Sequence, residues 1–118
     1  MQLELAVYRA RNGKEPFTTW YEGRADHRVA FNAVTQRLSR LRAGNFGDCK
    51  RVGRKGTGPR VVELRIHVGP GYRIYCARIS ANTALLLGGG TKRRQSKDIA
   101  MAQQRLADYM ARIHGKKT

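Results

Sequence analysis

Acidic side chains are scarce in this sequence, and so are cysteines and long apolar runs. Asp+Glu number 8 against Lys+Arg 24, so the 118-residue chain carries a formal net charge of +16. No apolar run approaches the roughly 20 residues of a membrane-spanning helix, and residues 1–4 do not open a signal peptide. The two cysteines are too few for a disulfide-built scaffold or a structural zinc site. We therefore expect a cytoplasmic chain without a membrane partner, with Cys49 and Cys76 buried or half-buried as free thiols.

The placement of the positive charge indicates a nucleic-acid partner. Between Lys50 and Lys97 there are twelve basic residues and one acid, Glu63. Arginine outnumbers lysine 17 to 7, and a guanidinium group can hold a phosphate through two hydrogen bonds and stack on bases. A surface that is charged only for solubility is the alternative, but such a surface rarely excludes acids over so long a segment. The pattern favours binding to nucleic acid.

Apolar periodicity predicts one α+β domain over residues 1–118. Residues 2–9 alternate as a half-buried strand, and helices are predicted at 17–21 and from a cap at Asp26 to a stop at Gly44. The second helix carries an apolar stripe, with its arginines, Arg37 among them, largely on other faces. Three or four antiparallel strands are predicted to follow, at 49–52, 61–68, 72–79 and 83–87.

A final helix is predicted after Ser96, a candidate cap, with an apolar stripe from Ile99 to Ile113. The unbroken apolar run of 83–87 indicates a central strand covered on both faces. For the sheet as a whole, we expect the helices to pack on one face and to leave the other face free. Glycines 88–90 are expected to let the strand end bend or to let its backbone approach a ligand.

Candidate catalytic residues follow from the alternation in the strand 61–68. Period two places Glu63, Arg65 and His67 on the outward face, and Arg73 of the next strand reaches the same surface. RNA cleavage without a metal needs a base, an acid and cations around one phosphate. Glu63 and His67 are the base and acid candidates on this strand, and Arg65, Arg73 and Arg93 would stabilise charge. A Glu63–Arg65 surface pair on an ordinary exposed strand is the structural alternative.

Metal and cofactor chemistry finds little support in the sequence. Three scattered histidines and the lack of paired carboxylates give no metal-binding constellation. Residues 88–92 contain three glycines and a lysine but lack the spacing of a phosphate-binding loop. We therefore expect neither a metal nor a cofactor.

Several segments together resemble a known family. The sequence is similar to the RelE/HigB-type toxins of bacterial type II toxin–antitoxin modules, in particular the branch of addiction-module killer proteins. The likeness covers about residues 13–102 in the same order, and any one piece would be weak alone. The segments that carry it are Gly13–Phe17 with Trp20, Arg37–Leu41, Gly44–Asp48, Glu63–Ile66, Gly69–Tyr75, Leu85–Lys92 and Asp98–Ile99.

This resemblance implies a RelE-like α+β fold whose twisted antiparallel sheet carries a basic concave surface. It also implies an endoribonuclease that cuts mRNA on the ribosome, and a small helix-turn-helix antitoxin that blocks it and joins it on operator DNA. Arg65, Arg73, Lys92 and Arg93 are the catalytic matches. The candidate RNA contacts are Lys50 and Arg51, to which we add Arg54, Lys55 and Arg94 from the same basic segment.

A second function class stays open on the sequence alone. A non-catalytic RNA- or ribosome-binding protein on the same scaffold would need the same cations. Binding requires only that the cations are present, whereas cleavage requires them around one scissile phosphate.

Overall fold

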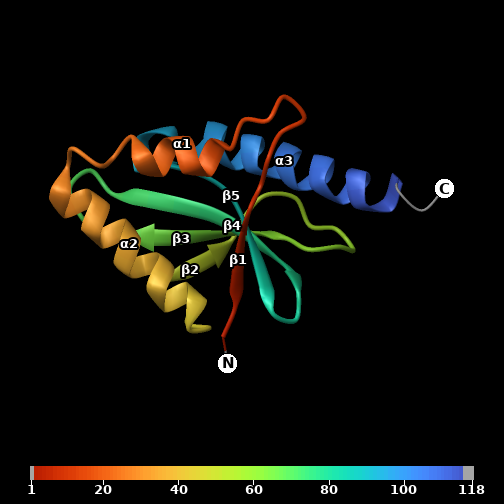
Figure 1. Ribbon diagram of the computed structural model, residues 1–118, viewed down its shortest axis with the longest axis horizontal. Coiled ribbons are helices and arrows are strands. Elements are labelled where there is room, and N and C mark those ends of the chain that lie inside the picture. The colour runs from red at the N-terminus through yellow and green to blue at the C-terminus, as the bar shows by residue number, and fades with distance from the viewer. Residues whose placement is uncertain (1, 116–118) are drawn as a thin grey trace.

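The computed structural model describes residues 2–115, in which three α-helices pack around a five-stranded mixed sheet (Figure 1). This confirms the α+β class and the C-terminal helix. In chain order the elements are β1 (Glu4–Val7), α1 (Pro16–Glu22), α2 (Arg28–Arg42), β2 (Cys49–Arg51), β3 (Val61–Ile66), β4 (Tyr72–Ser80), β5 (Thr83–Thr91), the 3₁₀ turn η1 (Lys92–Arg94) and α3 (Gln95–Gly115). None of the helices described in 2–115 is long and apolar enough to cross a membrane.

The sheet has the strand order β1-β5-β4-β3-β2. Strands β2 to β5 form an antiparallel meander, as the sequence predicts. Strand β1 adds a fifth strand that the sequence analysis does not place in this sheet. It runs parallel to β5, with Leu5 opposite Ala84. After α1 and α2 the chain enters β2 in the direction opposite to β1, and the three reversals of the meander then bring β5 parallel to β1.

Two apolar cores lie on the two faces of the sheet, so the expectation of a free face is wrong. Helices α1 and α2 pack on one face and α3 on the other. In Figure 1, α2 lies to the left of the strands and α3 runs above them toward the right. Residues 84–87 of β5 are buried throughout, which confirms the prediction that this run forms a strand covered on both faces. The first core includes Phe17, Val34, Leu41, Leu64 and Ile74, and the second includes Val61, Tyr75, Leu85, Leu87, Ala102 and Leu106.

The helix ends differ in detail from the expectation. Pro16 begins α1, a position where its missing N–H group leaves no hydrogen bond unmade. His27, not Asp26, precedes α2, and no side chain caps that end. The 3₁₀ turn η1 ends at Arg94 and α3 begins at Gln95, so Ser96 lies inside α3 instead of capping it. Gly44 adopts a positive φ of 91° just after α2, as the predicted stop requires.

Two side chains lie in environments opposite to those expected. Arg37, predicted to lie largely off the apolar stripe of α2, is buried. Cys49, predicted to be at least half-buried, is exposed on β2, whereas Cys76 is buried as expected. Cys49 is exposed because β2 is the outermost strand of the sheet, and the other two residues of β2 are exposed as well.

Glycines 88–90 continue β5 and let both layers of helices approach it. A Cβ atom on Gly89 would overlap the Trp20 indole of α1, and one on Gly90 would overlap the Asp98 carboxylate of α3. Gly88 similarly faces the Arg105 guanidinium, which donates to the Leu87 carbonyl at 3.0 Å. The three glycines therefore serve close packing of helices on the strand rather than a bend at its end.

Substituting Gly89 with alanine should destabilise the fold, because the added methyl group meets a rigid aromatic ring. We expect Gly89→Ala to lower the free energy of unfolding by about 1–3 kcal/mol, the usual cost of overpacking. Gly58→Ala is the matched control, since its Cβ would meet nothing within 4 Å. Urea denaturation of both variants measures the difference, and equal stabilities would contradict the close packing of Trp20.

The two thiols should react at very different rates. Burial raises the pKa of the Cys76 thiol to about 12, so almost none of it is thiolate at pH 8. A thiol reagent added to the native protein at pH 8 should therefore label one cysteine quickly and the second only after unfolding. Rapid labelling of the native Cys49→Ser variant would contradict the burial of Cys76.

Candidate functional site

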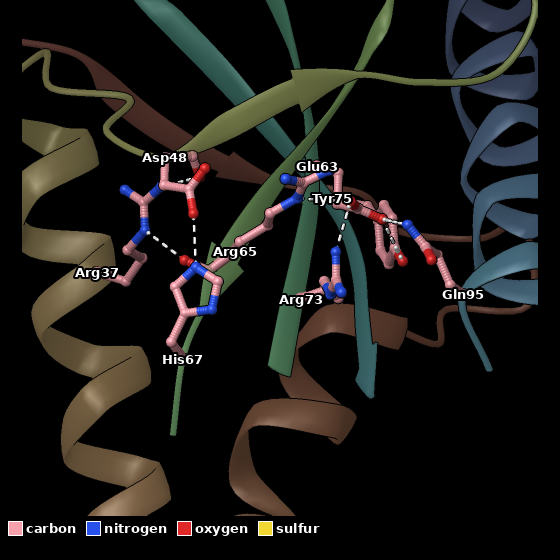
Figure 2. A network of polar contacts seen from close by, with 8 residues as sticks. All are labelled: Arg37, Asp48, Glu63, Arg65, His67, Arg73, Tyr75 and Gln95. Atoms are coloured by element: carbon pink, nitrogen blue, oxygen red, sulfur yellow. Dashed lines mark hydrogen bonds and ion pairs between the residues drawn. The ribbon is translucent and has the colours of Figure 1, made fainter. Parts of the chain in front are cut away.

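Glu63 lies at the centre of a network of polar side chains between the sheet and α3 (Figure 2). It is 0% exposed, so the prediction that it faces outward with solvent access is wrong. The alternation along β3 is as expected, but α3 covers the face of the sheet that carries Glu63. Val61, on the same face of β3, packs in the core beneath α3. Register places Glu63 opposite Tyr75 of β4 and Lys50 of β2.

Four donors reach the Glu63 carboxylate. Oε1 accepts a hydrogen bond from Nη1 of Arg73 at 2.8 Å and lies 3.4 Å from Nε of Arg65. Oε2 accepts from the hydroxyl of Tyr75 at 3.1 Å and from Nε2 of Gln95 at 2.8 Å. Because burying an unpaired carboxylate is very costly, these donors are what allows an acid here.

Tyr75 acts in this network as a permanent donor. Burial first, and then the negative charge of Glu63, raise the pKa of its phenol above the ordinary value. The hydroxyl therefore keeps its proton at neutral pH and points it at Oε2. Tyr75 therefore remains a hydrogen-bond donor to the carboxylate at neutral pH.

Arg65 and Arg73 lie directly opposite each other on β3 and β4. Like charges in such a cross-strand pair repel, and Glu63 between them offsets the repulsion. The Arg65 side chain is 31% exposed and that of Arg73 is 10% exposed. The pair therefore forms a fixed cationic unit with Arg65 as its more accessible member, which confirms the expectation that both share one face.

The basic turn η1 is tied to this network. Lys92, Arg93 and Arg94 are exposed, and the Lys92 backbone N–H donates to the Gly71 carbonyl at 3.1 Å. The next residue, Gln95, is one of the donors to Glu63. Strand pairing opposes Arg73 to Gly90, just before the turn. The three cations of η1 therefore emerge beside the arginine pair, as the sequence analysis expects of Lys92 and Arg93.

The remaining predicted RNA contacts do not share one surface. Lys50 is opposite Glu63 and so lies on its face of the sheet, whereas Arg51 is opposite Val62 and lies on the other. Arg51 and Lys55 line a groove on that second face, together with Phe46, Cys49, Val62, Arg60 and Arg78. Arg54 lies beside α3, where its backbone N–H donates to Oε1 of Gln103 at 2.6 Å. These cations surround the β2 edge rather than one concave face.

His67 is separate from the Glu63 network. It follows the end of β3, and its Nε2 lies 2.6 Å from Oδ2 of Asp48 (Figure 2). The hydrogen bond with His67 is the main cause that lowers the pKa of Asp48. The expected pairing of His67 with Glu63 as acid and base is therefore replaced by a His67–Asp48 pair.

Three participants were missed by the sequence analysis: Tyr75, Gln95 and Asp48. Tyr75 was detectable, because it follows Arg73 by two residues and so shares its face. Gln95 reaches Glu63 from the far side of η1, and Asp48 reaches His67 across a strand pairing, so neither has a local sequence signal. Within residues 2–115, no group of three or more His, Cys, Asp or Glu side chains is arranged to hold a metal ion.

Removing the Glu63 carboxylate should destabilise the protein strongly, because it leaves the mostly buried Arg73 cation unpaired. We expect Glu63→Ala to lower the free energy of unfolding by about 3–5 kcal/mol. Tyr75→Phe, which removes one hydrogen bond to the carboxylate, should cost about 1.5 kcal/mol. Glu22→Ala on the exposed surface of α1 is the control, with a change within about 0.5 kcal/mol. A Glu63→Ala variant as stable as this control would contradict the network.

The sequence is similar to a known protein whose description names no activity. The chain is 41% identical over 70 residues to a protein of Haemophilus influenzae described as an uncharacterized protein. The match covers 59% of this chain and 66% of that protein, slightly under two thirds of its length. No protein-family model matches the sequence. No solved structure matches it either.

Proposed function

We propose that this chain is the toxin of a type II toxin–antitoxin module, with a RelE-like fold, that cleaves mRNA on the ribosome in the cytoplasm. The observation that carries the proposal is the Arg65–Arg73 pair, fixed by a buried carboxylate beside the cations of η1. A nuclease of this type has to stabilise extra negative charge at one phosphate, and preorganised cations are suited to that task. The resemblance of residues 13–102 to RelE/HigB-type toxins supports the same activity.

The proposed cleavage is a metal-independent transesterification. The 2′-oxygen of the RNA forms a bond to the adjacent phosphorus, and the bond from phosphorus to the 5′-oxygen breaks. Arg65 and the η1 residues Lys92 and Arg93 stabilise the phosphoryl oxygens directly, because their side chains are the accessible ones. Arg73 adds positive charge from a largely buried position, where electrostatic effects are weakly screened.

Glu63 has a positioning role in this proposal. A carboxylate that is 0% exposed and occupied by donors from four side chains cannot take a proton from RNA. It instead fixes the angle and separation of the two arginines. Lys50 and Arg94 would bind neighbouring phosphates on the same side, while Arg51, Arg54 and Lys55 would bind RNA that continues around the β2 edge.

The expected protein partner is a small helix-turn-helix antitoxin, and the two together would bind operator DNA. The charge of +16 supports such a partner, because a surface this cationic binds RNA strongly and without sequence preference unless it is covered. The antitoxin would cover the arginine pair or the turn η1.

A non-catalytic RNA- or ribosome-binding protein is the second candidate. The burial of Glu63 favours it, because the carboxylate expected to act as the base has no access to substrate. The two candidates differ in one observable property. Only a nuclease leaves new RNA ends.

Expression of the full chain in bacteria should arrest growth and produce mapped cuts in mRNA. Arg65→Ala should reduce the cleavage rate about 10²–10³-fold, as expected when one transition-state donor is lost. Arg65 is more informative than Arg73, because Glu63 depends on Arg73 for its buried ion pair. Arg28→Ala, at an exposed position of α2, removes the same charge and should leave cleavage unchanged.

One result would contradict the nuclease, and another would contradict only the catalytic role of the arginine pair. Growth arrest without RNA cuts would favour the binding candidate. Equal cleavage by Arg65→Ala and wild type, with RNA binding weakened in the variant, would show that the arginine pair only binds.

A further inference from the structure

We propose that His67, oriented by Asp48, is the general base of the cleavage reaction, with Asp48 as its positioning residue. The inference rests on the proposed nuclease function and assigns the proton transfer that Glu63 cannot perform. Among the carboxylate and imidazole groups near the arginine pair, the Glu63 carboxylate is closed to solvent, whereas the His67 side chain is 75% exposed.

Asp48 is held in place by an arginine clamp. The buried Arg37 of α2 donates from Nη2 to the carbonyls of Phe46 at 2.6 Å and Asp48 at 2.8 Å, and from Nε to that of Arg65 at 3.2 Å. The Arg65 backbone N–H also donates to the Asp48 carbonyl at 3.0 Å. These hydrogen bonds fix the segment before β2 to β3. The anchored backbone places Oδ2 of Asp48 at 2.6 Å from Nε2 of His67.

The direction of the hydrogen bond between His67 and Asp48 determines which imidazole nitrogen has a free lone pair. The bond from His67 keeps Asp48 ionised below the usual carboxyl range, and an ionised carboxylate only accepts hydrogen bonds. Nε2 of His67 therefore carries a proton and donates it. In the neutral ring, Nδ1 then has the free lone pair, which is the requirement for a base.

The pair lies in a cationic pocket. A pocket of about 250 Å³ between α2 and the end of β3 is lined by Arg37, Arg40, Asp48, Arg65 and His67, among others. Three arginines and one aspartate thus line the same pocket as the imidazole, Arg37 and Arg40 from α2, Asp48 from the segment before β2 and Arg65 from β3. Arg65 lines this pocket and also contacts Glu63, so it connects the proton-transfer pair with the fixed arginine pair.

The chemistry balances with these groups alone. Nδ1 of His67 takes the proton of the 2′-hydroxyl as the 2′-oxygen bonds to phosphorus. The 5′-oxygen leaves with its electron pair and receives a proton either from the imidazolium, which restores the neutral ring, or from solvent, in which case the imidazolium releases its proton to solvent. The products are a 2′,3′-cyclic phosphate end and a 5′-hydroxyl end, with Arg65 beside the phosphoryl oxygens throughout.

The test compares RNA cleavage by the full chain on programmed ribosomes from pH 5 to 9. His67→Gln should lower the rate about 10²-fold or more and flatten the profile where an imidazole changes charge. Asp48→Asn keeps a polar group of the same shape and should cost about 10-fold. In the His67→Ala variant, added imidazole should restore part of the rate, a rescue that a purely structural role would not show.

Asp26 and His27, two adjacent residues between α1 and α2, provide matched controls. Asp26→Asn and His27→Gln alter the same residue types at exposed positions and should leave both rate and profile unchanged. His67→Gln within twofold of wild type, with an unchanged profile, would overturn the assignment while the nuclease function stands. A wild-type protein that produces no 5′-hydroxyl ends would overturn the proposed function itself, and this assignment with it.

Discussion

One buried carboxylate organises the polar part of this protein. Glu63 accepts hydrogen bonds from side chains of β3, β4 and the first residue of α3, so three elements depend on a single side chain. Without it, Arg65 and Arg73 would face each other across a strand pairing with nothing to offset their repulsion. The same group thus stabilises the fold and determines where its central cations lie.

The packing of the sheet reinforces this arrangement. Strand β5 is covered on both faces, and its three glycines let α1 approach from one side and α3 from the other. Because α3 lies so close, its first residue can reach Glu63 and the preceding turn is brought beside Arg73. The position of the exposed cations therefore follows from a strip of the strand that has no side chains.

Sequence periodicity predicts most elements here, because alternation and helical spacing are local properties. It also predicts the shared face of Arg65 and Arg73, which the register confirms. It fails for Glu63, because period two tells which face a residue takes and not whether a distant helix covers that face. It fails likewise for the His67–Asp48 pair and for parallel β1, since both depend on pairings between segments far apart in the chain.

The ends of the sheet have a consequence for self-association. The two outermost strands, β1 and β2, span only four and three residues, and β2 carries Lys50 and Arg51 on opposite faces. Both edges are short and β2 is cationic, which makes them poor templates for a foreign strand, because few hydrogen bonds are available and at β2 a second copy brings the same charges into contact. Many copies crowded along one polyanion would therefore remain separate molecules instead of joining edge to edge into a fibre.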